Sequence, residues 1–332
     1  MNTPDIQNAV NSIAAGHAVV VLDSESVSDT GFLVFAAELA TTSAVAFAVR
    51  HSPGYLRVAL NGDTCDRLGL PPVCQSASKT QAPQYAVSVD AAHGVGTGIS
   101  AADRATTIRM LASPATQPDD LTRPGHVVVE RAHGGGVLAR CGPAEAAADL
   151  ARLAGLQPCG VITELVSTAD PHQLANSVEA RSFAAEHGLR TVSIADVAAW
   201  RRDRETWLER VTSARLPTEC GEFRAIGYRS ITDGSEHIAL VCGDTPFGAG
   251  EVLVYVHREC AAGDIFGSLE CDCRSRLHDA MSIIAGHGRG VVLYLRSGGE
   301  ASDAVTAQIL TDLGVQTLET VDTFPQRVRE TA

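Results

Sequence analysis

Short apolar runs, each about the length of one buried β-strand, recur along the whole chain, and segments of helix-forming composition separate them. In the first half, strands are predicted at residues 18–22, 160–166 and 191–194, and helices at residues 143–156 and 177–189. In the second half, strands are predicted at residues 237–241, 252–257 and 291–295, and helices at residues 274–285 and 303–313. Both halves therefore belong to the mixed α/β (α+β) class, and this pattern leaves the strand order open.

A highly charged stretch without glycine or proline, Trp200–Arg215, lies between the two halves. We interpret it as a helical or extended connector, with the domain boundary near Leu216 and Pro217. A chain of 332 residues is long enough for two domains with separate cores. The predicted organisation is a first domain at residues 1–200, a charged connector at residues 201–216 and a second domain at residues 217–332.

Composition and charge narrow the possible partners. Apolar residues make up 45% of the chain and charged residues 20%, as in soluble globular proteins. The net charge of −13 argues against a nucleic-acid partner, although a local group of arginines can still bind a nucleotide or sugar phosphate. The N-terminus lacks the basic and apolar blocks of a signal peptide, and no apolar run reaches the length of a membrane span. We therefore expect a cytoplasmic protein with no membrane association.

Three of the nine cysteines lie close together within Val256–Cys273, in the order C-x10-C-x-C. Three thiolates can bind one zinc ion and leave its fourth position to water, as in catalytic zinc sites, whereas structural sites use four protein ligands. The spacing also fits buried thiols that bind no metal, because cysteine packs as a small apolar residue. At this point both interpretations of Cys260, Cys271 and Cys273 stay open.

The sequence around these cysteines, from Leu216 to Leu295, resembles GTP cyclohydrolase II. The family signature runs VHSEC and then GD-x-FGS-L-x-CDC, and it is matched by Val256–Cys260, with Arg258 in place of the serine, and by Gly263–Cys273. The stretches LPTECGEFRAIGYR and GRGVVLYLR also match. The resemblance implies a zinc ion held by Cys260, Cys271 and Cys273. In that family, zinc-bound water opens the imidazole ring of GTP, and formate leaves.

The resemblance changes after Arg296. Family members continue with a GHEGRG-type loop and an Asp-x-Arg pair that serves proton transfer and the triphosphate, but this chain passes through Ser297–Asp303 directly into a segment matching the later AQIL-x-DLGV helix. Several dozen residues are thus missing, and the nucleotide-contacting TNNP-x-K stretch is unmatched in Thr320–Arg327. Because each acid–base group contributes on the order of 10²–10⁴-fold to the rate, we expect no GTP cyclohydrolase II activity and a zinc ion retained for structure. We also expect the shortened domain to leave the residues after Arg296 mobile or packed on the first domain.

Residues from Ala9 to Trp200 resemble 3,4-dihydroxy-2-butanone 4-phosphate synthase, which converts ribulose 5-phosphate to a four-carbon phosphate and formate and uses magnesium. The matching blocks are TGISAADRATTIR, RPGH, GGGVLAR, EAAADLARLAGL, VSIAD and a CD-x-LGL segment. The resemblance implies that some family positions are retained as candidate site residues, namely Cys65, Asp103, His126, Arg140 and Glu164.

The magnesium ligands of that family are replaced. Its acidic loop DDEDRENEGD, aligned on Gly31, has Val27 for the arginine, Ser28 for the metal-binding glutamate, and Thr30 and Phe32 for two further acids. In its GHTEA motif the histidine ligand is Pro143, and a threonine that contacts phosphate is Ala144. Serine and proline cannot replace an anionic oxygen and an imidazole as ligands. We therefore expect neither magnesium binding nor synthase activity.

The remaining polar residues of the first half have plainer interpretations. Asp23, Glu25 and Asp29 are interpreted as parts of a solvated acidic loop rather than as a new cation site. Without a metal, His126 and Glu164 are interpreted as structural hydrogen-bonding residues, and His133 in AHGGG as an exposed loop histidine.

We favour a riboflavin-biosynthesis homologue in which both active sites are eroded: a pseudoenzyme that serves as a non-catalytic scaffold or regulatory paralogue. The expected partners are a second copy, in the homodimer that the resemblance implies, an active paralogue, or a small phosphorylated metabolite. One alternative is an active riboflavin-pathway enzyme with one or both activities. Another is an enzyme repurposed for a different sugar phosphate or a purine.

Overall fold

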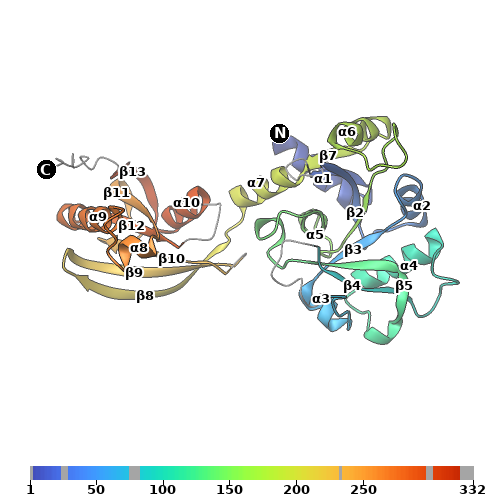
Figure 1. Ribbon diagram of the computed structural model, residues 1–332, viewed down its shortest axis with the longest axis horizontal. Coiled ribbons are helices and arrows are strands. Elements are labelled where there is room, and N and C mark those ends of the chain that lie inside the picture. Colours follow the sequence, from blue (N-terminus) through green and yellow to red (C-terminus); the bar gives the residue numbers. More distant parts are fainter. Residues whose placement is uncertain (1–2, 24–28, 75–82, 232–233, 297–301, 322–332) are drawn as a thin grey trace. The chain divides into compact units, whose positions relative to one another are not determined.

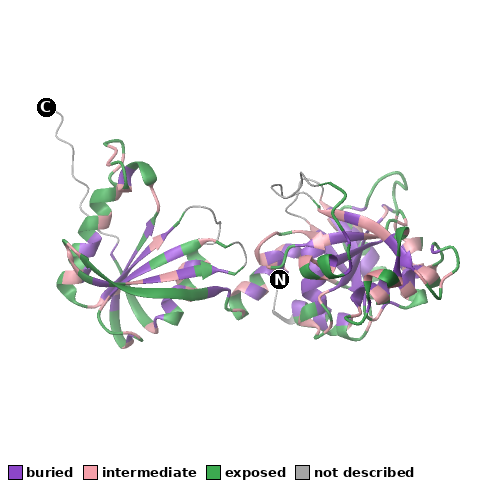
Figure 2. Cartoon of the chain, turned by 90° about the horizontal axis from the view of Figure 1, so that it is seen from below, coloured by how far each residue is buried: buried purple, intermediate pink, exposed green. Residues whose placement is uncertain are grey.

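The computed structural model describes residues 3–23, 29–74, 83–231, 234–296 and 302–321. The chain divides into two compact units between Arg204 and Glu205, and we refer to them as the first and second domains. In each domain the buried residues concentrate along the central strands of one sheet (Figure 2).

A seven-stranded mixed sheet forms the centre of the first domain (Figure 1). Its spatial order is β4-β5-β3-β6-β2-β1-β7, in which β1 pairs with β7 and β3 with β5 in parallel, and the other neighbours are antiparallel. The strands are β1 (Val19–Asp23), β2 (Thr30–Ala36), β3 (Arg57–Asn61), β4 (Tyr85–Ala91), β5 (Leu121–Ala132), β6 (Gly160–Glu164) and β7 (Arg190–Ser193). The central position of β3, between β5 and β6, becomes important below.

Helices cover both faces of this sheet. Apolar residues of α2 (Thr42–Arg50), α4 (Ala101–Ala112) and α6 (Ser177–Glu186) pack in the core on one face. Those of α1 (Thr3–Ala14), α5 (Pro143–Leu153) and α7 (Ile194–Arg204) pack in the core on the other, and α3 (Gly62–Arg67) follows β3. Because side chains alternate along a strand, Leu33 of β2 lies in the first core and Phe32 in the second.

The helix predicted at residues 143–156 is confirmed as α5. Pro143 occupies its first position, where an N–H has no intrahelical partner to lose. Gly155, just after the C-cap, has φ of 77°, a left-handed conformation that glycine adopts without strain. Local sequence therefore fixes where this helix starts, and the start of α5 faces the candidate site of the first domain.

The second domain contains a six-stranded mixed sheet in the order β13-β11-β12-β10-β9-β8. The strands are β8 (Leu208–Thr218), β9 (Gly221–Ser230), β10 (Glu236–Cys242), β11 (Gly248–Arg258), β12 (Gly290–Leu295) and β13 (Val315–Thr320). Helix α9 (Cys273–His287) buries Ala280, Met281 and Ile284 against one face. The short α8 (Ala261–Asp264) precedes α9, and α10 (Ser302–Asp312) precedes β13.

The strands and helices predicted from sequence are confirmed with small shifts at their ends. The residues predicted as a helical or extended connector, 201–216, form the end of α7, which continues to Arg204, and most of β8. Strand β8 lies at the edge of the sheet, and its residues between Leu208 and Thr218 are exposed. It therefore lacks the alternation of buried and exposed residues that marks a half-buried strand.

The expectation that the chain after Arg296 would be mobile or pack on the first domain is wrong for residues 302–321. Strand β13 pairs in parallel with β11, and Ile309 and Leu313 are fully buried in the second domain. Tyr228 of β9 also donates a hydrogen bond from its hydroxyl to Asp312 of α10, at 2.5 Å. The segments 297–301 and 322–332 lie outside the described residues. Among the described helices, none is long and apolar enough to cross a membrane.

Replacing Ile309 by alanine should therefore destabilise the second domain by about 2–5 kcal/mol, because a fully buried side chain is truncated. Urea unfolding followed by circular dichroism measures the change. Thr311→Ala, on an exposed position of the same helix, is the matched control and should have a small effect. Equal stabilities of Ile309→Ala and Thr311→Ala would contradict the burial of α10.

Candidate functional sites in the two domains

The first turn of α5 carries the residues that align with the synthase family's histidine and threonine. Pro143 is its first residue, and Ala144 is fully buried with no polar side-chain atom. Glu145, also buried, accepts hydrogen bonds from Nε of Arg140 at 2.8 Å and from the backbone N–H of His133 at 2.7 Å. This helix start therefore offers no imidazole or hydroxyl to a ligand, and its carboxylate already has two partners.

Four adjacent strands place one side chain each in a row beneath this turn. In spatial order they are Glu130 of β5, Arg57 of β3, Glu164 of β6 and Phe32 of β2. The two terminal nitrogens of Arg57 donate separately, Nη1 to Glu130 at 2.8 Å and Nη2 to Glu164 at 2.5 Å. The Arg57 guanidinium carbon also lies 5.9 Å from the centre of the Phe32 ring. One arginine thus contacts every other member of the row.

The electrostatics of the row follow from its burial. Desolvation opposes the charge of Arg57, but Glu130 and Glu164 outweigh it and raise the pKa of the guanidinium. Burial raises the pKa of Glu130, and the attraction of Arg57 opposes that rise. Glu145 and Arg140 also act on Glu130, which puts the row close to the first turn of α5. The two clusters form one connected polar region.

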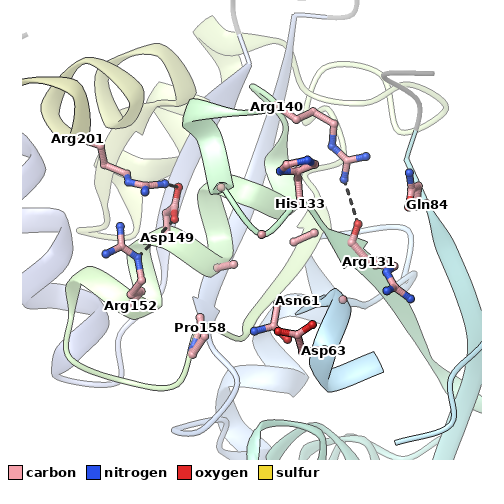
Figure 3. Close-up of a pocket in the computed structure, with 15 residues that line it drawn as sticks. Asn61, Asp63, Gln84, Arg131, His133, Arg140, Asp149, Arg152, Pro158 and Arg201 are labelled. Carbon is pink, nitrogen blue, oxygen red and sulfur yellow. Dashed lines mark hydrogen bonds and ion pairs between the residues drawn. The ribbon is translucent and has the colours of Figure 1, made fainter. Parts of the chain in front are cut away.

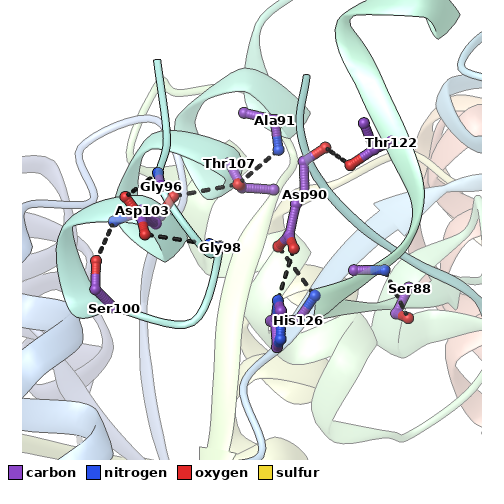
Figure 4. A network of polar contacts seen from close by, with 11 residues as sticks. Ser88, Asp90, Ala91, Gly96, Gly98, Ser100, Asp103, Thr107, Thr122 and His126 are labelled. Atoms are coloured by element: carbon purple, nitrogen blue, oxygen red, sulfur yellow. Dashed lines mark hydrogen bonds and ion pairs between the residues drawn. The ribbon is translucent and has the colours of Figure 1, made fainter. Parts of the chain in front are cut away.

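A second polar network contains His126 and Asp103 (Figure 4). Nδ1 of His126 lies 2.6 Å from a carboxylate oxygen of Asp90, whose other oxygen accepts the backbone N–H of His126. Asp103 accepts the backbone N–H groups of Gly96 and Gly98, which lower the pKa of its carboxyl together with Ser100. The Asp90–His126 pair and the contacts of Asp103 meet at Gly98, where an added Cβ would lie 2.1 Å from Asp90 and 2.8 Å from His126.

Cys65 does not join either network. It is fully buried in the core on the α2, α4 and α6 face of the sheet, and burial raises the pKa of its thiol to about 11. A thiol with that pKa is almost entirely protonated at neutral pH. Cys65 thus lies outside the two polar networks, and its role as a retained site residue stays a prediction.

Arg140 borders a cleft of about 480 Å³ at the carboxyl ends of β3 and β5 (Figure 3). The exposed loop histidine His133 is confirmed and lines the same cleft. On the opposite wall, the carboxylate of Asp149 forms ion pairs with Arg201 at 2.6 Å and with Arg152 at 3.7 Å. Gly136, between them, leaves no room for a side chain, since an added Cβ would lie 2.4 Å from Arg201 and Asp149. The cleft is thus lined by paired arginines.

The second domain brings its three predicted cysteines together. The sulfurs of Cys260, Cys271 and Cys273 all lie within 4.8 Å of one another, and those of Cys260 and Cys271 are 3.8 Å apart. A tetrahedral zinc ion with Zn–S bonds of about 2.3 Å requires sulfur separations of about 3.8 Å. The geometry and the soft donor set therefore fit zinc, with one position outside the cysteine set.

Asp264 holds this cluster in place. Its carboxylate accepts the backbone N–H of Cys260 at 2.9 Å and the hydroxyl of Tyr294 at 2.8 Å, and it lies 3.0 Å from Nε2 of His257. His257 and Asp264 are buried, so these bonds tie β11, α8 and β12 into one rigid support. Such outer contacts orient the ligands of metal sites.

Comparison with known proteins shows the same two halves. The sequence profile of 3,4-dihydroxy-2-butanone 4-phosphate synthase matches residues 7–200, and that of GTP cyclohydrolase II matches residues 209–331. The riboflavin biosynthesis protein RibBA of Rhodococcus jostii is 48% identical over 359 residues, covering 97% of this chain and 86% of that protein. The chain belongs to the RibBA family of bifunctional riboflavin-biosynthesis proteins. The corresponding protein of Mycobacterium tuberculosis is also 48% identical over 97% of this chain.

Solved structures agree with this family. RibBX of A. baumannii, a two-domain 3,4-dihydroxy-2-butanone 4-phosphate synthase, has a TM-score of 0.77 and 30% identity, covering 97% of this chain and 94% of that one. A 3,4-dihydroxy-2-butanone 4-phosphate synthase in complex with two magnesium ions has a TM-score of 0.57 and 38% identity, covering 60% of this chain and 97% of that one. The recognised family and fold class are thus confirmed.

The overall similarity and the local substitutions point in different directions. High identity along the chain, taken alone, favours an active RibBA-type enzyme and gives no support for eroded sites. The 359-residue alignment is nevertheless longer than the 332-residue chain, so the relatives contain residues that this chain lacks. The case for lost chemistry therefore rests entirely on particular positions.

Those positions do not fit magnesium in the first domain. Magnesium prefers carboxylate and water oxygens in octahedral geometry. Pro143 supplies no ligand atom, and Glu164 is engaged by Arg57. Val27 and Ser28, with Glu25, lie outside the described residues. Asp29 is described: it has a φ of 39°, and its buried Oδ1 has no hydrogen-bond partner among the described residues. A single carboxylate at that point does not make a magnesium cradle.

Arg57 and Glu130 were missed by the sequence analysis, although a signal was present. Both interrupt apolar strand sequences, Arg57 in YLRVAL and Glu130 in VVVERA. Charged residues in buried strands are rare unless they are paired. Two opposite charges in such strands could therefore have been predicted to meet.

The full chain purified with zinc should contain close to one zinc ion, held by the three cysteines. Cys271→Ser should lower the zinc content severalfold, because a hydroxyl is a much poorer ligand than a thiolate. Metal analysis by mass spectrometry measures it. Cys74→Ser, at an exposed cysteine outside the cluster, is the control and should keep full zinc content. Equal zinc in both variants would refute the site.

Proposed function

We propose that this chain is a RibBA-family protein that no longer performs the magnesium-dependent sugar-phosphate reaction, and that it serves riboflavin metabolism as a non-catalytic scaffold or regulatory paralogue. The observation that carries this proposal is the set of replaced ligand positions: Pro143 and Ala144 occupy the first turn of α5, and the retained Glu164 is already paired with Arg57. Neither a metal nor a sugar phosphate would find its expected ligands there.

The second domain supports the proposal in a different way. Its cysteine cluster fits zinc, which when bound lowers the pKa of a coordinated water. This chain's own contribution is the support that Asp264, His257 and Tyr294 give to the cluster. The segment in which the family carries its Asp-x-Arg pair is shortened to Ser297–Asp303. We propose that zinc here stabilises the domain.

A scaffold or regulator requires a ligand or partner, and the first domain offers a place for one. The cleft lined by Arg131, Arg140 and Arg152 has a size suited to a small phosphorylated metabolite. Arg152 is its most exposed arginine, with 42% of its side chain accessible. We further propose a homodimer and a cytoplasmic location, as expected for a protein of metabolism.

An active riboflavin-pathway enzyme is the second candidate. The observation that favours it is the 48% identity over 97% of the chain to proteins named for riboflavin biosynthesis. Global similarity supports this candidate better than the first. The similarity to RibBX, a two-domain synthase, makes the first domain the place to look for activity.

A formate assay separates the two candidates. The full chain is incubated with ribulose 5-phosphate and magnesium, and separately with GTP and zinc, and formate is measured against a no-enzyme blank. We expect no formate from either substrate, because the groups that supply on the order of 10²–10⁴-fold each are absent. The Rhodococcus jostii relative, assayed in parallel, is the positive control. Formate above the blank from either substrate would establish the second candidate.

A further inference from the structure

The function proposed above uses only the Arg57–Glu164 pair of the row, although all four residues, Glu130, Arg57, Glu164 and Phe32, lie on central strands of the first sheet. Its carboxylates come from the two strands that flank β3, so the arginine side chain lies between them on one face of the sheet. We propose that the guanidinium of Arg57 takes the place of a divalent cation in the first domain, neutralising Glu130 and Glu164 from within the chain. This inference rests on the proposed loss of magnesium chemistry.

The burial of the row makes a positive charge necessary. Arg57 and Glu130 are each only 2% exposed, and the Glu164 side chain is 20% exposed. Two carboxylates this close, removed from water, cannot both stay ionised without a cation. A bound metal is one source of that charge, and a fixed arginine is another that no chelator can remove. The short distances of 2.8 and 2.5 Å show that Arg57 meets both acids.

The position of Arg57 matches the place where a metal would be needed. Glu164 is a retained family position. The first turn of α5 is the segment in which the family carries its histidine ligand, and its Glu145, with the preceding Arg140, acts on Glu130. The same stretch has lost that ligand to Pro143. A buried cation and the loss of a metal ligand therefore occur in one connected region.

Phe32 also favours an arginine over a metal at this place. It stands where the family has an acid, directly opposite Glu164 in the β2–β6 pairing, and its ring lies 5.9 Å from the Arg57 guanidinium. An aromatic face attracts a guanidinium but gives no ligand to magnesium. A metal site would lose a ligand by this substitution, whereas a site with a buried arginine gains a favourable contact with the aromatic ring. The substitution at Phe32 thus favours the arginine over a metal.

The structure also shows that Arg57 fills the space rather than bordering it. Its Nε is buried and has no hydrogen-bond partner among the described residues, so the side chain is enclosed on all sides. A hydrated metal ion would have to displace the guanidinium, not bind beside it. Wild-type protein should therefore be indifferent to magnesium and manganese in the first domain.

Removal of the arginine tests the inference, with Mn²⁺ as the probe because free Mn²⁺ is counted directly by electron paramagnetic resonance. Full-length wild type should show no saturable Mn²⁺ site in the first domain, and Arg57→Met, of similar length without charge, should gain one saturable Mn²⁺ site. Arg57→Met/Glu164→Gln should lose that gain, and Arg57→Lys should never acquire it. Asp29→Asn in the wild-type background should leave Mn²⁺ binding unchanged.

Three results would overturn the inference. The first is a stoichiometric Mn²⁺ site in wild type that Glu164→Gln or Asp29→Asn abolishes. The second is a folded Arg57→Met protein with no gained site. The third applies if Arg57→Met is unfolded without ions. Its near-ultraviolet circular dichroism should then recover with Mn²⁺ but not with sodium at equal ionic strength. A failure to recover with Mn²⁺ would refute the inference. Ion binding is read without formate, so these outcomes are distinct from those of the activity assay.

Discussion

Burial of charge within the first sheet is the constraint on which the rest of the first domain depends. Arg57 and Glu130 occupy central strands on a face that is otherwise packed with alanine, valine and isoleucine from α1, α5 and α7. A buried ion pair is tolerated only with good geometry, and removing one partner typically costs about 3–5 kcal/mol. The register of β3 against both β5 and β6 supplies that geometry, so strand order, register and charge pairing specify one another.

The two domains retain different features of the RibBA family. In the first domain the polar side chains of the candidate site pair with each other: Arg57 with Glu164, Arg140 with Glu145, and His126 with Asp90. In the second domain the soft ligands persist together with their supporting carboxylate, Asp264. The two domains thus differ in kind: buried charges are neutralised within the chain in the first, and the segment after Arg296 is shortened in the second.

The elements that were predicted from sequence were found because apolar runs and caps are local signals, whereas others, among them β3, β5 and α4, were not predicted. Helix α5, for example, was fixed by its proline, its alanines and Gly155. Strand β8 escaped because an exposed edge strand has no buried face to reveal it. The meeting of Arg57 with Glu130 and Glu164 depends on strand order, which periodicity does not encode. Likewise, the CD-x-LGL match could not show that Cys65 points into the core.

The glycine at position 136 has a mechanical consequence for the arginine-lined cleft. Its backbone touches the Asp149–Arg201 pair, and the carbonyl of the preceding Gly135 accepts a hydrogen bond from Arg201. The loop is therefore clamped between α5 and α7 and cannot swing open by itself. Whatever enters the cleft must be accommodated by long side chains such as Arg152, which can rotate. Selectivity would then come from the reach of a few arginines, with the walls staying rigid.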